Sequence, residues 1–119
     1  MEKIRVDVAW CDRNFGASLS ENVPGAVVLT ADTYEKLLHD VPQWLIDGDY
    51  ELEYNLVDVA TVLRAYEPFV SLAAISRATG INQHQLSHYA TRKKKPRAEQ
   101  RKRIVEGIHK IGRELMSVV

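Results

Sequence analysis

Residues 71–90 read SLAAISRATGINQHQLSHYA, and this stretch decides the fold of the C-terminal half of the chain. Ser71 can cap a helix, and Gly80 can end that helix because glycine accepts the left-handed backbone conformation. Asn82 can then cap a second helix. The pattern therefore predicts two short helices joined by a tight turn.

The apolar residues of this stretch indicate how the two helices pack. Ile75, Ile81 and Leu86 are placed to lie between them, and Ser76 is small enough for the helices to cross closely. Most of the second helix is polar. We therefore expect the polar side chains of this helix to face outward.

A basic segment and a long amphipathic stretch follow the second helix. Residues 92–97 read RKKKPR, and residues 98–118 carry isoleucines at helical spacing. Over residues 72–111 the chain resembles the phage-repressor-like, Xre-type DNA-binding family, whose hallmark is a helix-turn-helix. The matching features are the two helices, the basic loop with its proline, and the closing helix with Ile104, Ile108 and Ile111.

The resemblance implies a set of contacts with double-stranded DNA. In that family the second of the two helices enters the major groove, and its first residues contact base edges. The residues carried over to this role are Gln83, His84 and Gln85, with Ser87 and His88 nearer the DNA backbone. Phosphate contacts are expected from the helix starts at Ser71 and Asn82 and from Arg92, Lys93, Lys94, Lys95, Arg97 and Arg101.

Two glycines interrupt the last helix and leave two interpretations open. Gly107 and Gly112 each cost about 1 kcal/mol of helix propensity relative to alanine. They either allow close helix approach in a dimer, or this helix simply closes the DNA-binding core and frays at its end. We favour a homodimer or higher homo-oligomer, because helix-turn-helix proteins usually bind two half-sites.

The N-terminal half alternates apolar and polar residues, a pattern typical of β-strands. Residues 4–10, 15–20, 26–30 and 50–56 are predicted strands, and the helix between the last two is capped by Asp32 or Thr33. Turns are expected over 11–14 and over 21–25, and Pro42 is expected to kink or end the helix. The predicted order is βββαβ.

This half resembles the N-terminal domain of HicB antitoxins, a degenerate ribonuclease-H-like unit. The resemblance rests on the strand ending at Trp10, the strand starting at Phe15, the turn 23–25, and a helix entry at Asp32 followed by two leucines. It implies an α+β protein with a toxin-binding domain over residues 1–56 and an all-α helix-turn-helix domain over residues 57–119. In the family, such a protein binds the small, basic, RNA-cleaving HicA toxin and represses its own operon.

The distribution of charge agrees with two different partners. Residues 1–70 carry five Lys or Arg against thirteen Asp or Glu, a net charge of −8, whereas residues 71–119 carry eleven against three, a net charge of +8. A basic half gains affinity for a polyanion by releasing counterions. The alternative function is a stand-alone repressor whose N-terminal unit mediates oligomerisation or senses a ligand.

Catalysis, cofactors and metals are not expected. The candidate carboxylates for a nuclease, Asp7, Asp12, Glu21 and Asp32, are interpreted as solvated acidic residues. His84 and His88 lie four residues apart, but the sequence suggests no third metal ligand. The 119 residues contain one cysteine and no apolar run long enough to cross a membrane, and we expect a cytoplasmic protein.

Overall fold

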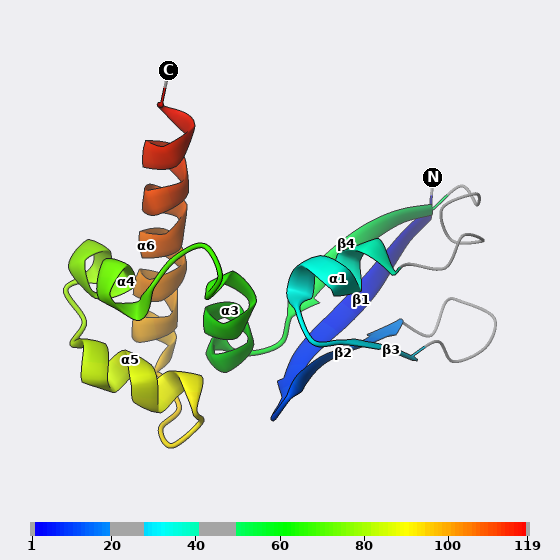
Figure 1. The fold of residues 1–119 in the computed structure, drawn as a ribbon, viewed down its shortest axis with the longest axis horizontal. Coiled ribbons are helices and arrows are strands. Elements are labelled where there is room, and N and C mark those ends of the chain that lie inside the picture. Colours follow the sequence, from blue (N-terminus) through cyan, green and yellow to red (C-terminus); the bar gives the residue numbers. More distant parts are fainter. Residues whose placement is uncertain (1, 20–27, 41–49, 119) are drawn as a thin grey trace. The chain divides into compact units, whose positions relative to one another are not determined.

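The computed structural model describes residues 2–19, 28–40 and 50–118, and within them the protein is a mixed α+β chain (Figure 1). It divides into two compact units, residues 1–65 and residues 66–119. The predicted turn over 21–25, the start of the third strand at residue 26 and the effect of Pro42 fall outside the described residues.

The first unit is built on a four-stranded sheet. Its elements are, in chain order, β1 (Glu2–Cys11), β2 (Asn14–Leu19), β3 (Val28–Ala31), α1 (Tyr34–His39) and β4 (Tyr50–Leu56). The strand order in space is β3-β2-β1-β4, with β1 antiparallel to β2 and parallel to β4. Among the described residues of this unit, the elements up to β4 follow the predicted order of three strands, a helix and a strand.

Alternation of side chains gives the sheet one apolar face, and α1 covers it (Figure 1). Ile4, Val6 and Val8 of β1 are buried on that face together with Leu37 of α1. Thr33 caps α1, since its Oγ1 accepts a hydrogen bond from the backbone N–H of Lys36 at 3.1 Å. The N-cap was left open between Asp32 and Thr33, and Thr33 fills it.

A further helix, α3 (Val59–Tyr66), is joined to the sheet by one buried hydroxyl. The Oγ1 of Thr61 accepts a hydrogen bond from the backbone N–H of Trp10 at 3.0 Å and donates one to the Asp58 carboxylate at 2.6 Å. The guanidinium of Arg64 lies 5.5 Å from the centre of the Trp10 ring. The division of the chain therefore falls after residue 65, and not after residue 56 as expected, because α3 is bonded to β1.

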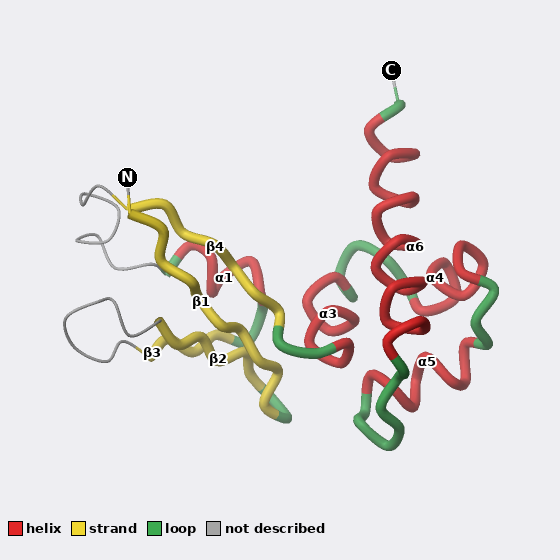
Figure 2. Tube along the Cα trace, turned by 180° about the vertical axis from the view of Figure 1, so that it is seen from behind, coloured by secondary structure: helices red, strands yellow, loops and turns green. Residues whose placement is uncertain are grey.

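The second unit contains α4 (Leu72–Thr79), α5 (Gln83–Ala90) and α6 (Ala98–Met116) (Figure 2). The caps are those predicted: Ser71 Oγ accepts from Ala74 N at 3.1 Å, and Asn82 Oδ1 accepts from His84 N at 2.8 Å. Gly80 ends α4 with a φ of 76°. The core consists of Ile75, Ile81, Leu86, Tyr89 and Ile104, all of them buried.

The glycines of α6 have different surroundings. A Cβ at Gly107 would lie 2.4 Å from Cγ2 of Thr79 on α4, whereas a Cβ at Gly112 would meet nothing within 4 Å. Thr79 cannot turn away easily, because its Oγ1 donates to Ile75 O at 2.7 Å and accepts from Ile81 N at 3.1 Å. Gly107 thus allows the close approach of α6 to α4 inside one chain.

This difference makes the two glycines a matched pair for mutation. Gly112→Ala should raise the free energy of unfolding by about 1 kcal/mol, because alanine favours the helix. Gly107→Ala should lower it by about 1 kcal/mol, because overpacking outweighs the same gain in propensity. Urea unfolding followed by circular dichroism measures both, and an equal stabilisation of the two variants would contradict the α4–α6 contact.

Candidate nucleic-acid interface

The outward face of α5 presents the polar residues that the sequence predicted. Gln83 and His84 are exposed, and Gln85, Ser87 and His88 are half-buried. The opposite face is anchored by Leu86, whose side chain is 0% exposed, and by Tyr89 and Ala90. The N-terminal turn of α5 is therefore accessible to a ligand while the helix itself is fixed in the core.

Side-chain hydrogen bonds fix the turn between α4 and α5. The small hydroxyl of Ser76 donates to the carbonyl oxygen of Ile81 at 2.6 Å, and the Thr79 hydroxyl accepts from the N–H of the same residue. Both backbone groups of the buried Ile81 are satisfied by α4, which is required of buried polar groups. The start of α5 is thus placed rigidly relative to α4.

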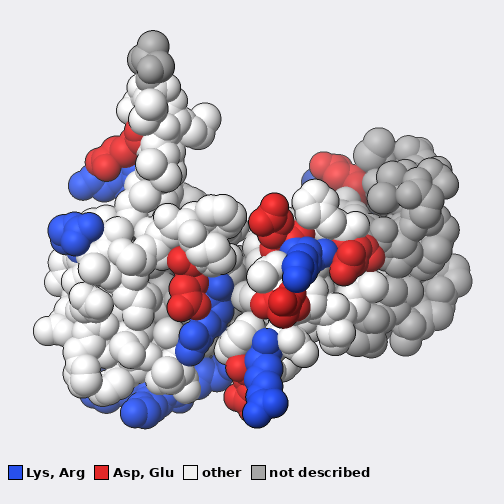
Figure 3. Space-filling view, viewed as in Figure 1, with Lys and Arg blue, Asp and Glu red and all other residues white. Residues whose placement is uncertain are grey.

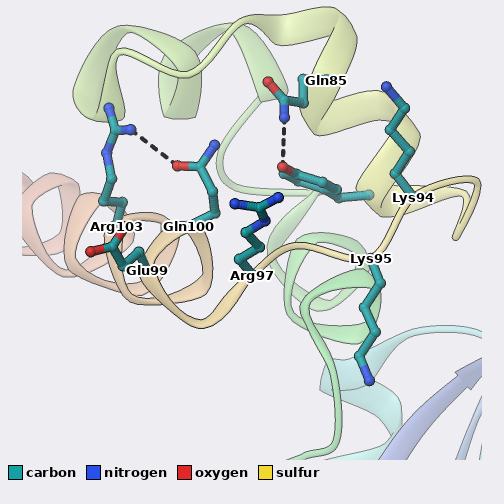
Figure 4. Close-up of a pocket in the computed structure, with 8 residues that line it drawn as sticks. Gln85, Lys94, Lys95, Arg97, Glu99, Gln100 and Arg103 are labelled. Atoms are coloured by element: carbon teal, nitrogen blue, oxygen red, sulfur yellow. Dashed lines mark hydrogen bonds between the residues drawn. The ribbon is translucent and has the colours of Figure 1, made fainter.

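Gln85 differs from its neighbours on α5. Its Nε2 donates a hydrogen bond to the hydroxyl of Tyr89 at 2.7 Å, so its amide is engaged within the unit (Figure 4). Both residues line a hollow of about 540 Å³. Among the three residues expected to contact base edges, Gln83 and His84 are the exposed ones, whereas Gln85 forms part of the wall of this hollow.

Basic side chains surround the same hollow. Lys94 and Lys95 of the loop after α5, Arg97 at the start of α6, and Arg103 line it together with Glu99 and Gln100 (Figure 4). Figure 3 shows Lys and Arg side chains gathered at the lower edge of the second unit, where Figure 1 places this loop. The hollow thus combines a polar wall with four cationic side chains, which is a suitable setting for an anionic ligand.

Other expected phosphate contacts lie elsewhere on the second unit. Arg92 and Lys93 are exposed, and Arg92 has a φ of 62° where the chain leaves α5. Arg101 is exposed and lines a separate hollow of about 430 Å³ together with Lys102 and His109. The structure therefore brings Lys94, Lys95 and Arg97 together and leaves Arg101 apart from them.

Sequence reasoning did not find the role of Arg103. Its Nη2 donates to the carbonyl oxygen of Thr79 at 2.6 Å, and its Nη1 donates to Oε1 of Gln100 at 3.0 Å. A cation at the carboxyl end of a helix such as α4 is favourable because it satisfies carbonyl oxygens there. The partners lie 24 positions apart in the chain. Helix periodicity places Arg103 beside the buried Ile104, but it does not predict that the Arg103 side chain bonds to the carbonyl oxygen of Thr79.

The two histidines of α5 lie side by side. The ring centroids of His84 and His88 are 4.4 Å apart, and the rings are inclined at 60°. Desolvation lowers the pKa of His88 below its ordinary value, and the positive charge of His84, Lys94 and Lys93 lowers it further. In the described part of the chain, no three His, Cys, Asp or Glu side chains are grouped so as to hold a metal ion.

The candidate carboxylates of the first unit have local partners. Asp7 accepts hydrogen bonds from Asn55 Nδ2 at 2.9 Å and Arg5 Nε at 2.8 Å, which hold the pKa of its carboxyl below the ordinary value. Asp32 pairs with Lys36 at 3.1 Å, and Glu21 lies outside the described residues. Asp7 therefore has a guanidinium, not a second carboxylate, as its ionic partner.

Comparison of the chain with protein-family models, with curated proteins and with solved structures finds no match. No helix among the described residues combines the length and the apolar character needed to cross a membrane. The interpretation of the interface therefore depends on its residues and their geometry.

Arg103 and Arg101 form a second matched pair. Arg103→Met should lower the free energy of unfolding by about 1 kcal/mol, because the Thr79 carbonyl loses a charged donor. Arg101→Met should change it by less than about 0.5 kcal/mol, as for most exposed positions. Thermal and urea unfolding of the two variants provide the comparison. Equal losses would show that the bond from Arg103 to Thr79 does not stabilise the unit.

Proposed function

We propose that this protein is an antitoxin that also represses transcription of its own operon. The second unit binds double-stranded operator DNA as a helix-turn-helix, and the first unit binds and neutralises a small, basic, HicA-like toxin that cleaves RNA. The DNA-binding part of this proposal depends on the N-terminal turn of α5, which is exposed and is fixed by the Ser76–Ile81 hydrogen bond. A basic loop follows directly after α5.

In the proposed DNA complex, α5 and the loop that follows it contact different parts of the DNA. Gln83 at the exposed start of α5 contacts base edges in the major groove, where glutamine pairs with adenine through two hydrogen bonds. Lys94, Lys95 and Arg97 neutralise phosphates beside it. The side chains of Ser71 and Asn82 each accept one backbone N–H as caps, and the phosphate contacts are assigned to the other N–H groups of the two helix starts.

Two features support a toxin-binding role for the first unit. Its four strands and α1 follow the order expected of the ribonuclease-H-like unit of HicB antitoxins. The net charge of −8 over residues 1–70 complements a basic partner. Neutralisation in this proposal is steric and electrostatic, and the antitoxin contributes no chemical step.

The proposed DNA-bound form contains at least two copies of the chain. Each copy presents one α5, and two copies are needed to occupy two half-sites about one turn of DNA apart. Near the end of α6, Leu115, Met116 and Val118 are exposed, with Leu115 61% accessible. Leu115 continues the isoleucine stripe of α6, and we assign this exposed apolar end of the chain to the pairing of two copies.

Base contacts and phosphate contacts respond differently to mutation. Gln83→Ala should reduce discrimination between operator variants by about 1–3 kcal/mol, because one base contact is lost. Lys94→Ala should weaken binding to all sequences alike and reduce the slope of log K against log salt by about one. Fluorescence anisotropy with DNA from upstream of the coding sequence measures both effects, with Lys110→Ala on α6 as the control. Identical behaviour of the two variants would refute the proposed placement of α5.

The toxin-binding part has its own test. The full-length protein, tagged, is expressed together with the untagged product of the adjacent small reading frame, and the mass of the eluted material is measured. A stable complex that also forms with the Lys94→Ala variant is expected, because binding is assigned to the first unit. Absence of a complex would leave a stand-alone repressor as the function.

A further inference from the structure

Two histidines of α5 lie next to the basic loop that follows this helix. The rings of His84 and His88 lie 4.4 Å apart on the outward face of the helix. The backbone N–H of Lys94 donates to the carbonyl oxygen of His88 at 3.3 Å, which brings the loop against the end of α5. The two imidazoles and the loop that carries Lys93 and Lys94 therefore lie at the same end of α5, and both lysines act electrostatically on His88.

The groups that act on this corner are basic. The positive charges that lower the pKa of His88 come from His84, Lys94 and Lys93. Of the two helices that flank α5, α4 has exposed Arg77 in its last turn, and α6 has Glu99 and Arg103 at the hollow beside Gln85 and Tyr89. Protonating His88 in the free protein would therefore add charge to an already cationic site, which is electrostatically unfavourable.

A bound anion makes protonation at this site favourable. A phosphate group placed between the imidazoles and the lysines offers acceptors for the ring N–H groups and compensates their charge. The protonated forms then become the stable ones, because an opposite charge within about 4–6 Å favours the charged state. A divalent cation would fit the corner less well, because both lysines would repel it.

We propose that His84, His88, Lys93 and Lys94 form a proton-linked subsite for a phosphodiester group of the DNA backbone. This inference rests on the proposed DNA-binding function and makes it more specific. It moves His84 from base recognition, where the sequence placed it, to the backbone. It leaves Gln83 as the exposed residue of the first turn that contacts base edges.

The sign of the pH dependence follows from linkage. In the free protein the pKa of His88 lies below its ordinary value, and bound phosphate raises it, so His88 takes up a proton when DNA binds. Affinity therefore rises as the pH falls through the pKa of the bound state. It becomes constant below the pKa of the free state. Each unit of difference between the two pKa values contributes up to about tenfold in affinity.

The experiment measures binding of the full chain to a labelled random-sequence DNA duplex at constant ionic strength, with a chelator present, between about pH 8 and about pH 5.5. The wild-type affinity should rise by about tenfold over this range. The double variant H84Q/H88Q should lose most of this rise. His109→Gln, which alters an exposed histidine of α6 in the other hollow, should retain it.

The variant His88→Arg tests the role of charge at this position. Because a gain in affinity is expected, a folding defect cannot produce the same result. The permanent positive charge of this variant should raise the affinity near pH 8 above that of the wild type and flatten the pH profile. A double variant with the same pH dependence as the wild type would overturn the subsite while leaving DNA binding intact. Absence of duplex binding at every pH would overturn the proposed function and the subsite together.

Discussion

Thr79 at the end of α4 is the residue on which the second unit depends. Its hydroxyl bonds to Ile75 O and Ile81 N, and its carbonyl oxygen accepts from Arg103. Its methyl group occupies the space that a side chain at position 107 would need. One residue therefore positions the turn that begins α5 and sets the distance to α6.

This arrangement explains how short helices hold an exposed face in place. A helix of eight residues is unstable alone in water, so α4 and α5 depend on packing. Leu86 and Ile75 supply that packing at 0% and 1% exposure. Because few apolar residues are enough to anchor α5, almost all of its outward face carries polar side chains.

Local chemistry made much of the fold predictable, and contacts distant in sequence account for most differences. The caps Ser71 and Asn82 were recognised, and the third was narrowed to Asp32 or Thr33, because a cap bonds only two or three residues ahead. The place of α3 was missed because Thr61 bonds to Trp10, 51 positions away. Arg103 was missed for the same reason. The bond from Gln85 to Tyr89 was not predicted although the two lie one helical turn apart, because glutamine on a polar helix face gives no sign of being held by a neighbour.

The two units also differ in how their charges are compensated. On the sheet, opposite charges meet across neighbouring strands or along one, as in Lys3 with Glu53 at 3.4 Å and Arg5 with Asp7 at 2.8 Å. Such exposed pairs contribute little stability, but each places opposite charges side by side. Around the α5–α6 loop, by contrast, four cations share one hollow with the single carboxylate of Glu99. Charge that is not compensated within a folded unit raises its free energy, and a polyanion that binds there lowers it. At this hollow, therefore, positive charge exceeds negative charge, although Arg103 is itself bonded to Thr79 and Gln100.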